Sequence, residues 1–549
     1  MPDRSDSPPG DPLSGPASSH PSGVPLSAAL PALRAASQPA VGSAPGGEFA
    51  ALTAAEAVGA LITGEITAES YAQALLRQCE AGAALNAFIC LRTELVLEAA
   101  RECDLRRQSG SRLGRLHGLP VSVKDSINTR QLPTTAGTAA LRDFQPREDA
   151  PLVRILRDNG AIVLGKTNMH ELSWGYTSNN VAYGAVRNPY DPARIAGGSS
   201  GGSAASVAFR MTPLGVAEDT EGSIRVPAAL CGTAGFRPST GRYPNDATAP
   251  TTMVFDQLGP HARSVEDLVL FDTVVTGNEL AAVAPSLKGI RLGIIRPYFW
   301  KALDPEVERV AERALGALRR AGAELIEGEL PELPRLIGLI TRQVQFHDFR
   351  PTMTEYLQRY HAGLTFEELM ARSSPVMRRI GESTLHLGGR NFVPEQEYQQ
   401  ILTEHLPALR AMYRAYFRHS GVSAIVFPAS ILPAPLLQSP AQEEALHVQL
   451  GGEFLPFDVA ISRNIAPGST AGLPGLVLPA GLTREGLPVA LEFDGPSGCD
   501  PQLLSLGLTL EAELGRLPPP FGALRRQCAA PDRFAEHAAA ASPRSAHHE

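Results

Sequence analysis

The feature of this sequence that most constrains its fold is a series of short apolar runs, each set between helix-like segments. Residues 154–159 end a helix-like segment, Gly160 follows, and residues 161–164 are apolar throughout. A helix, a glycine and then a short buried strand is the repeating unit of α/β proteins. Similar runs predict further core strands at 119–123, 290–295 and 423–427. The sequence therefore predicts the α/β class.

Three longer segments have the composition and spacing of helices. Residues 49–106 are rich in Ala, Leu and Glu with apolar spacings of three and four, so we expect helices throughout. Residues 305–321 form a helix with Asp304 as its N-cap and Gly322 just past its end. Residues 330–420 are strongly helical and richer in aromatic residues and Met, which predicts a helical cap or insertion over one edge of the sheet.

The two ends of the chain differ in composition from its middle. Residues 1–46 are rich in Pro, Ser, Gly and Ala and contain no aromatic residue, so we expect a disordered segment, with a docking or targeting tail as the alternative. Residues 529–549 resemble them and predict a disordered tail. Hydrophobic residues make up 43% of the whole chain, enough for a large core. We therefore expect residues 47–528 to form one domain.

Charge and cysteine content narrow the class of protein. The net charge of −8 argues against a nucleic-acid partner and against a polybasic membrane binder. We expect no transmembrane helix, because no apolar stretch approaches about 18 residues, and no secretory signal. The six cysteines are scattered without a Cys-x-x-Cys pair, so neither a metal site nor a disulfide scaffold is predicted. A reduced, cytoplasmic location fits best.

Two motifs in the sequence are misleading. Residues 160–167 match the P-loop pattern, but their four middle residues are the apolar strand, so the backbone donors of a phosphate cradle would be used in a sheet. Residues 198–202 resemble the G-x-S-x-G nucleophile elbow, which requires a preceding strand. Residues 188–194 contain two prolines and are not a strand. Neither nucleotide binding nor an α/β-hydrolase site is expected.

Three other segments of the sequence point to the same kind of protein. They are Val-Ser-Val-Lys-Asp at 121–125, Gly-Gly-Ser-Ser-Gly-Gly-Ser-Ala-Ala at 197–205 and Glu-Asp-Thr-Glu-Gly-Ser-Ile-Arg-Val-Pro-Ala at 218–228. In this order they resemble the amidase signature family of serine hydrolases, and the resemblance extends to residues 165–169, 231–241 and 467–488. It implies that residues 47–528 are one amidase catalytic domain with a large mixed twisted sheet flanked by helices on both faces.

The resemblance implies a catalytic triad without histidine. A serine hydroxyl is a weak nucleophile until a base removes its proton. By the family pattern, Ser223 attacks the carbonyl carbon, Ser199 relays the proton, and Lys124 is the base and must be neutral to act. The family also holds the relay serine in a cis peptide, and Gly198 before Ser199 is consistent with that.

The resemblance also assigns the surroundings of the triad. An oxyanion hole would be formed by the backbone N–H groups of Thr220, Glu221, Gly222 and Ser223, and one such donor typically contributes about 2.7–4 kcal/mol. Ser200 would support the network by hydrogen bonding. We expect two charged residues near this loop to be structural and paired, namely Asp219 and Arg225.

Glu221 is a departure from the family, which usually has Gly at this position. A side chain there would be strained if the backbone had positive φ, and a carboxylate would oppose a developing oxyanion unless it pointed away or were paired. Three interpretations remain open: Glu221 faces outward and is tolerated, it contacts a polar substrate, or the enzyme is slow or inactive. A rise in turnover of Glu221→Gly would favour the third.

Several stretches resemble the indoleacetamide and mandelamide hydrolase branch of the family, whose members cleave primary amides of aryl-substituted acids. We therefore expect an amidase that acts on a small-molecule amide and needs no cofactor and no metal. Candidate pocket residues are Met169, His170 and Trp174. The alternatives are an inactive homologue that acts as a binding protein, and a hydrolase of anilides, esters or peptide amides. The oligomeric state stays open, with a homodimer as one alternative.

Overall fold

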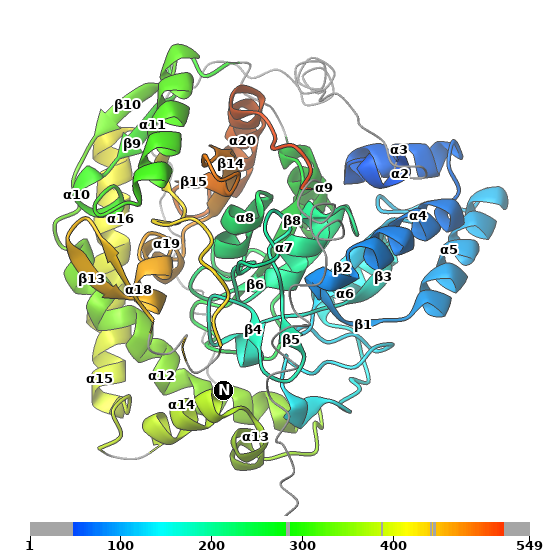
Figure 1. The fold of residues 1–549 in the computed structure, drawn as a ribbon, viewed down its shortest axis with the longest axis horizontal. Coiled ribbons are helices and arrows are strands. Elements are labelled where there is room, and N and C mark those ends of the chain that lie inside the picture. The colour runs from blue at the N-terminus through cyan, green and yellow to red at the C-terminus, as the bar shows by residue number, and fades with distance from the viewer. Residues whose placement is uncertain (1–47, 281–285, 386–387, 440–441, 443–445, 521–549) are drawn as a thin grey trace, which may run out of the picture.

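The computed structural model describes residues 48–280, 286–385, 388–439, 442 and 446–520, and its centre is a twisted sheet (Figure 1). The strands of this sheet are β1 (Phe88–Leu91), β2 (Pro120–Lys124), β3 (Ile162–Thr167), β6 (Leu214–Asp219), β7 (Ala234–Arg237), β8 (Gln257–Ala262), β9 (Arg291–Ile294), β10 (Glu324–Glu327), β11 (Ala424–Pro428), β14 (Gly475–Leu482) and β15 (Pro488–Asp494). Two short hairpins lie outside it, formed by β4 (Asn179–Asn180) with β5 (Gly184–Ala185) and by β12 (His447–Leu450) with β13 (Glu453–Pro456).

The main sheet is mixed. Its 11 strands follow the order β1-β3-β2-β6-β8-β7-β14-β15-β11-β9-β10. Strand β2 runs parallel to β3 and β6, and β9 runs parallel to β10 and β11. The pairs from β6 through β8, β7, β14 and β15 to β11 are antiparallel, as is the edge pair β1–β3. The prediction of a large mixed sheet is confirmed.

Helices connect and cover these strands. They are α2 (Glu48–Ala51), α3 (Ala54–Thr63), α4 (Ala68–Ala81), α5 (Thr93–Gln108), α6 (Pro151–Asp158), α7 (Gly201–Ala208), α8 (Arg225–Cys231), α9 (Val265–Thr276), α10 (Arg296–Phe299), α11 (Pro305–Arg320), α12 (Leu333–Arg359), α13 (Phe366–Arg372), α14 (Pro375–Leu385), α15 (Glu395–Gln400), a π-helical segment (Ile401–His405), α16 (Leu406–Ser420), α18 (Phe457–Ser462), α19 (Ala466–Ala471) and α20 (Asp500–Leu514). Short 3-10 turns lie at Ala83–Leu85, Ala139–Leu141 and Glu171–Ser173.

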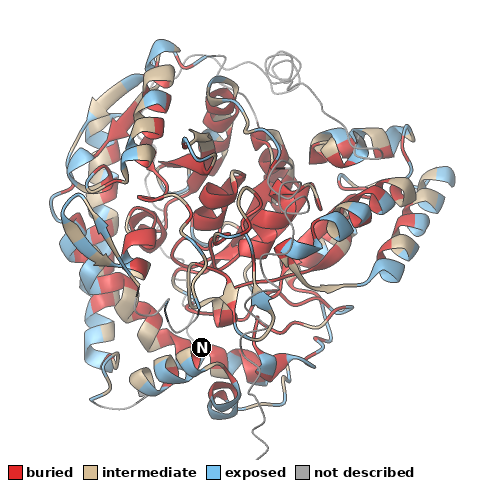
Figure 2. Ribbon diagram, in the orientation of Figure 1, coloured by how far each residue is buried: buried red, intermediate tan, exposed pale blue. Residues whose placement is uncertain are grey.

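The two faces of the sheet carry different helices. Glu492 of β15, which lies opposite Val477 of β14, binds Arg225 of α8. The neighbouring residue Leu476 lies against Gly507 of α20, where a Cβ atom would come within 2.4 Å of the leucine. Because successive side chains of a strand point to opposite faces, α8 and α20 cover opposite sides of the sheet. Figure 2 shows that the central strands and α7 and α8 are buried, while α5 and α11 expose one side.

The structure confirms the four strands expected from apolar runs and the helix that begins after Asp304, which ends at Arg320. Strand β3 includes Gly165, Lys166 and Thr167, which pair with β1 and β2, so the residues that match the P-loop pattern are a strand and not a phosphate-binding loop. The expectation of helices throughout residues 49–106 is wrong at β1. That strand is an edge strand with only half-buried residues, and its composition does not differ from that of its helical neighbours.

The expected helical segment at 330–420 contains α12 to α16, and α12 contacts α13, α14, α16 and α19 (Figure 1). The domain limits at 47–528 and the extent of the insertion stay predictions. Residues 1–46 and 529–549, expected to be disordered, lie outside the described residues. Within the part of the chain that the structure describes, no helix is long and apolar enough to cross a membrane.

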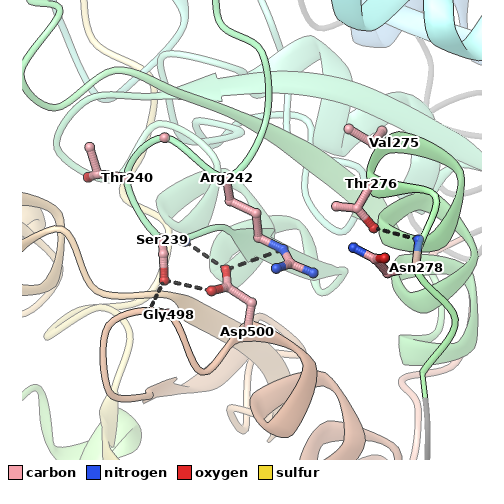
Figure 3. Close-up of a pocket in the computed structure, with 9 residues that line it drawn as sticks. Ser239, Thr240, Arg242, Val275, Thr276, Asn278, Gly498 and Asp500 are labelled. Atoms are coloured by element: carbon pink, nitrogen blue, oxygen red, sulfur yellow. Dashed lines mark hydrogen bonds and ion pairs between the residues drawn. The ribbon is translucent and has the colours of Figure 1, made fainter. Parts of the chain in front are cut away.

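A hollow of about 520 Å³ lies where residues 239–242 meet α9 and α20 (Figure 3). The Ser239 N–H and hydroxyl donate to Asp500 at 2.7 and 2.6 Å, and the Gly498 N–H donates to Ser239 Oγ at 2.9 Å. Arg242 makes two hydrogen bonds to Asp272 at 2.8 and 2.7 Å, and its Nε lies 3.7 Å from Asp500. These charged groups satisfy one another, so the hollow is a junction of the scaffold.

Candidate active site

Lys124 lies at the end of β2, fully buried, beside the equivalent end of β6. The parallel register pairs Val123 with Val216, which brings Lys124 next to the last residues of β6. The Lys124 ammonium donates to Ser199 Oγ at 2.7 Å and to Glu218 Oε2 at 2.6 Å. The side chains of Lys124 and Glu218 have exposed fractions of 0% and 1%, so this is an ion pair shielded from solvent.

Ser199 lies in the loop that precedes α7, and the Gly198–Ser199 peptide bond is cis. Its carbonyl accepts from the His170 N–H at 3.0 Å and from Ser178 Oγ at 3.2 Å, which fixes the loop against its neighbours. Ser200 extends the contact in two directions. Its hydroxyl donates to the Glu218 carbonyl at 3.0 Å, and its N–H donates to the Ser223 carbonyl at 3.3 Å. The loop of Ser199 and the turn of Ser223 are therefore joined through the backbone.

The turn that carries Ser223 is organised by Asp219. The carboxylate of Asp219 accepts from the N–H groups of Gly222 at 2.8 Å and Ile224 at 3.0 Å. Gly222 has φ of +119°, a conformation that favours glycine. Because Asp219 occupies the Gly222 N–H, the expectation that this donor faces an oxyanion is wrong. Thr220, Glu221 and Ser223 remain as candidate donors.

Asp219 and Arg225 form the expected pair, with Arg225 Nε 3.0 Å from Asp219 Oδ2. Burial opposes the ionisation of Asp219, but the charges of Arg225 and Arg237 outweigh it and hold the pKa of Asp219 at about 2. Arg225 also binds Glu492 and the hydroxyl of Ser469. The turn therefore rests on a buried network of opposite charges.

Ser223 lines a cavity of about 850 Å³ between this turn, the Glu171–Ser173 turn, and helices α12, α14 and α18. His170 and Trp174 line it. Met169 is fully buried and is not among the residues that line the cavity, so its assignment to the pocket is wrong. Trp174 stacks on Phe346 of α12, with ring centroids 5.7 Å apart and planes 10° apart. One wall of the cavity is therefore aromatic.

Glu221 also lines the cavity, and its side chain is buried and paired. Gln345 donates to Glu221 Oε2 at 2.6 Å, and Arg342 Nε lies 3.6 Å from the same oxygen. Of the three interpretations, an outward-facing Glu221 is therefore wrong. Its backbone is not among those with positive φ, so the strain considered for a side chain at this position does not arise.

Sequence reasoning missed three functional candidates: Glu218, Arg342 and Gln345. Glu218 is the first residue of the motif at 218–228, but the motif does not indicate that its carboxylate contacts Lys124. That contact depends on the register of β2 and β6. Arg342 and Gln345 lie in a helix more than 100 positions along the chain, and no local pattern relates them to the Ser223 turn. Within the described residues, no group of three or more His, Cys, Asp or Glu is placed to hold a metal ion.

Comparison with known proteins defines the class. Residues 70–504 match the family described as Amidase. Indoleacetamide hydrolase of Agrobacterium vitis is 37% identical over 440 residues, which cover 80% of this chain and 92% of that protein. Mandelamide hydrolase of Pseudomonas putida is 36% identical over 482 residues, which cover 85% of this chain and 92% of that protein. The chain belongs to the amidase family and is a hydrolase that acts on linear amides.

A solved structure supports the same assignment at the level of the fold. The crystal structure of an amidase matches with a TM-score of 0.75 and 32% sequence identity, covering 84% of this chain and all of that chain. The resemblance found in the sequence motifs is therefore confirmed for the family and the fold.

Proposed function

We propose that this amide hydrolase uses Ser223 as nucleophile, Ser199 as proton relay and Lys124 as base. The observation that carries the proposal is the buried hydrogen bond of 2.7 Å from Lys124 to Ser199, in a loop joined to the turn of Ser223. As Ser223 Oγ bonds to the carbonyl carbon, its proton passes to Ser199 and the proton of Ser199 passes to Lys124. The proton returns to the leaving nitrogen, and water then releases the acid from the acyl-enzyme.

Backbone donors of the Ser223 turn would stabilise the tetrahedral oxyanion. With Gly222 bound to Asp219, the proposal rests on the N–H groups of Thr220, Glu221 and Ser223. Glu221 would oppose the oxyanion if it were free, but Arg342 and Gln345 draw its carboxylate toward α12. This pairing favours an active enzyme over the alternative of an inactive homologue that acts only as a binding protein.

We propose a primary amide of an aryl-substituted acid as the substrate class. The stacked rings of Trp174 and Phe346 offer an aromatic surface in the cavity, and apolar side chains of Met377, Ile380 and Val459 extend it. Two of the relatives reported above are named for indoleacetamide and mandelamide, which are aryl-substituted primary amides. Cytoplasmic location, and a homodimer, stay predictions.

Ammonia release from a panel of amides tests this proposal. The panel contains phenylacetamide, mandelamide, indoleacetamide, benzamide and short aliphatic amides. We expect wild-type protein to release ammonia from aryl-substituted amides and Ser223→Ala, Ser199→Ala and Lys124→Ala to lose at least about 1,000-fold in rate, since members of a catalytic unit fail together. Release that survives Ser223→Ala would contradict the triad. Formation of the acid product from anilides, esters or peptide amides alone, measured in parallel because anilides and esters release no ammonia, would contradict the substrate class.

A further inference from the structure

The buried carboxylate of Glu218 touches the proposed base, and the triad alone gives it no role. Glu218 Oε2 accepts from Lys124 at 2.6 Å and from Ser173 Oγ at 2.9 Å. A fixed negative charge at this distance favours the protonated form of the amine, whereas a base must be neutral. The site therefore needs a group that can take the proton of Lys124 without moving charge through the protein.

A second carboxyl group lies on the far side of Glu218. Thr220 Oγ1 lies 2.8 Å from Glu218 Oε1 and 2.6 Å from Asp256 Oδ1. A hydroxyl has one proton to donate, and an ionised carboxylate only accepts. Both contacts can be hydrogen bonds only if one of the two carboxyl groups carries a proton and donates it to Thr220.

The proton belongs on Asp256. Its Oδ2 atom accepts from the N–H groups of Thr251 at 2.8 Å and Thr252 at 3.1 Å, so Oδ1 is the atom free to carry the proton toward Thr220. Burial first, and then the charge of Glu218, raise the pKa of Asp256 to about 8. Asp256 therefore donates to Thr220, which donates to Glu218.

We infer that Glu218 is the acceptor of the Lys124 proton and extends the relay that begins at Ser223, while Thr220 and Asp256 hold the other oxygen of Glu218. This inference rests on the proposed function. An N–H bond of Lys124 breaks and an O–H bond forms on Glu218, which converts an ion pair into two neutral groups. The Lys124 lone pair then accepts the proton of Ser199 as Ser199 takes that of Ser223. Glu218 acts through Lys124 and is a positioning residue.

The transfer leaves the net charge of the buried site unchanged, which matters because isolating a charge in a protein interior is costly. The neighbouring charged and titratable groups on the packed elements already have partners. They include Asp219, paired with Arg225; Asp125, which lies 3.5 Å from Lys166; Asp348 of α12, which accepts from Thr252 at 2.5 Å; and His261 of β8, which contacts Ser203 and the Ile224 carbonyl.

This arrangement predicts a gain of activity at alkaline pH that depends on Asp256. When Asp256 loses its proton, two carboxylates face the single proton of Thr220, and one hydrogen bond is lost. The added negative charge is bridged to Glu218 by Thr220, so it favours a proton on Glu218 and assists the transfer. The rate should therefore rise as the pH rises through about 8, and a rate that falls or stays level there overturns the inference. A lysine base without the acid pair would have the same pH profile in Asp256→Asn as in the wild type.

The experiment measures the rate at which a fluorophosphonate labels Ser223, and the rate of ammonia release, across a pH range from about 6 to 10. Glu218→Gln keeps the shape of the side chain but cannot accept the proton. We expect it to slow labelling at pH 7 by about tenfold or more, within the range of general acid–base effects. If Glu218 only opposed the neutral lysine, the same change would speed labelling. A smaller loss, or a gain, overturns the inference.

Asp256→Asn tests the second carboxyl group, because its amide donates to Thr220 permanently. We expect a loss of less than about tenfold at pH 7, since acid–base assistance from Glu218 is retained, together with disappearance of the rise near pH 8. A rise near pH 8 that persists in Asp256→Asn overturns the inference.

The matched control is Glu511→Gln, which alters a buried glutamate that binds Arg516 at 2.9 Å and the N–H of Val265 at 3.0 Å, away from the cavity. It should keep the wild-type pH profile even if its thermal midpoint drops. Failure of the proposed function has a different signature: wild-type protein that is not labelled, or labelling that survives Ser223→Ala. Either of those results would overturn the inference together with the triad.

Discussion

At the residue scale, the pairing of Glu221 decides whether a carboxylate can lie next to the nucleophile. Its oxygen contacts Gln345 and Arg342, and Arg342 also reaches Asp458 at 3.1 Å. Gln345 satisfies the acceptor and Arg342 supplies the compensating charge. The carboxylate is therefore directed to α12 and its field at the oxyanion position is reduced.

Removal of Arg342 should expose the effect of this charge. In Arg342→Met, Glu221 keeps Gln345 but loses its cation, and we expect kcat for ammonia release to fall about tenfold, equivalent to about 1.4 kcal/mol. The double variant Arg342→Met with Glu221→Gln should recover most of that loss. Arg335→Met is the matched control, because Arg335 lies on the same helix and pairs with Glu332 at the surface. A double variant as slow as Arg342→Met would show that Arg342 acts on the substrate instead.

The residues of the proposed triad were predictable because a family pattern fixes their order, whereas their partners were not. Nothing near Glu218 in the sequence indicates that Asp256 shares a threonine hydroxyl with it. The two lie on β6 and in the segment before β8, and only the antiparallel pairing of those strands brings them together. Met169 was misplaced for a related reason: the sequence places it after a strand but does not show which way its side chain turns.

At the scale of elements, α12 sets the composition of the cavity. Arg342, Gln345 and Phe346 follow one another at helical spacing and face the same cavity, so one helix supplies both the cation beside Glu221 and the ring beside Trp174. Phe349, one turn further on, meets Trp174 edge to face with ring centroids 5.0 Å apart. A change at Phe346 should therefore alter the aromatic wall of the acyl site while the contacts of Arg342 and Gln345 with Glu221 remain.

Phe346→Ala should weaken the binding of aryl amides selectively. An aromatic pair contributes about 0.5–1.5 kcal/mol beyond its buried area, so we expect KM for phenylacetamide or indoleacetamide to rise about fivefold. KM for short aliphatic amides should change little. Leu339→Ala, at a partly exposed position of the same helix, is the control and should leave both constants unchanged. An equal rise in KM for aliphatic amides would indicate that α12 had shifted rather than that an aromatic contact had been lost.

Strands with continuous apolar runs could be predicted, and strands with mixed composition could not. Strand β11 is apolar because both its faces are buried, and β9 is apolar and buried after its first residue, Arg291. Strand β6 is just as buried but ends in Glu218 and Asp219, whose charges are neutralised by partners from other elements. Local composition cannot indicate such partners. Strand β6, which carries Glu218 and Asp219, is therefore not marked by a continuous apolar run.

At the scale of the whole molecule, the layer between the sheet and α8 contains an unusual number of buried charges. Arg225 and Arg237 face Asp219, Glu492 and Asp494. Burial raises the pKa of Asp494 to about 6. A carboxyl group of raised pKa contributes stability that is complete below its unfolded pKa and is lost as the pH rises through the folded value. Asp494 therefore favours the folded state toward acid pH, whereas Asp219, whose pKa is lowered to about 2, has the opposite effect.

His261 has an effect opposite to that of Asp494, and its contribution can be isolated by a variant. Burial lowers its pKa to about 4; its Nε2 lies 2.6 Å from the Ile224 carbonyl and its Nδ1 lies 3.0 Å from Ser203 Oγ. These contacts fit a neutral ring that donates to the carbonyl and accepts from the hydroxyl. A depressed pKa contributes stability that is complete above the unfolded value of about 6.5 and is lost as the pH falls through the folded value.

His261→Gln can make the same two hydrogen bonds but does not titrate. The difference in the free energy of unfolding between wild type and this variant should be constant above about pH 7. As the pH falls to about 4, the wild type should lose about 3 kcal/mol of unfolding free energy relative to the variant, which is the size that the change in pKa implies. Urea unfolding followed by tryptophan fluorescence measures both proteins at each pH, and His419→Gln, at an exposed position, is the control. A difference that stays constant between pH 7 and 4 would mean that His261 keeps its ordinary pKa in the folded protein and that the sheet tolerates a charged ring beneath the Ser223 turn.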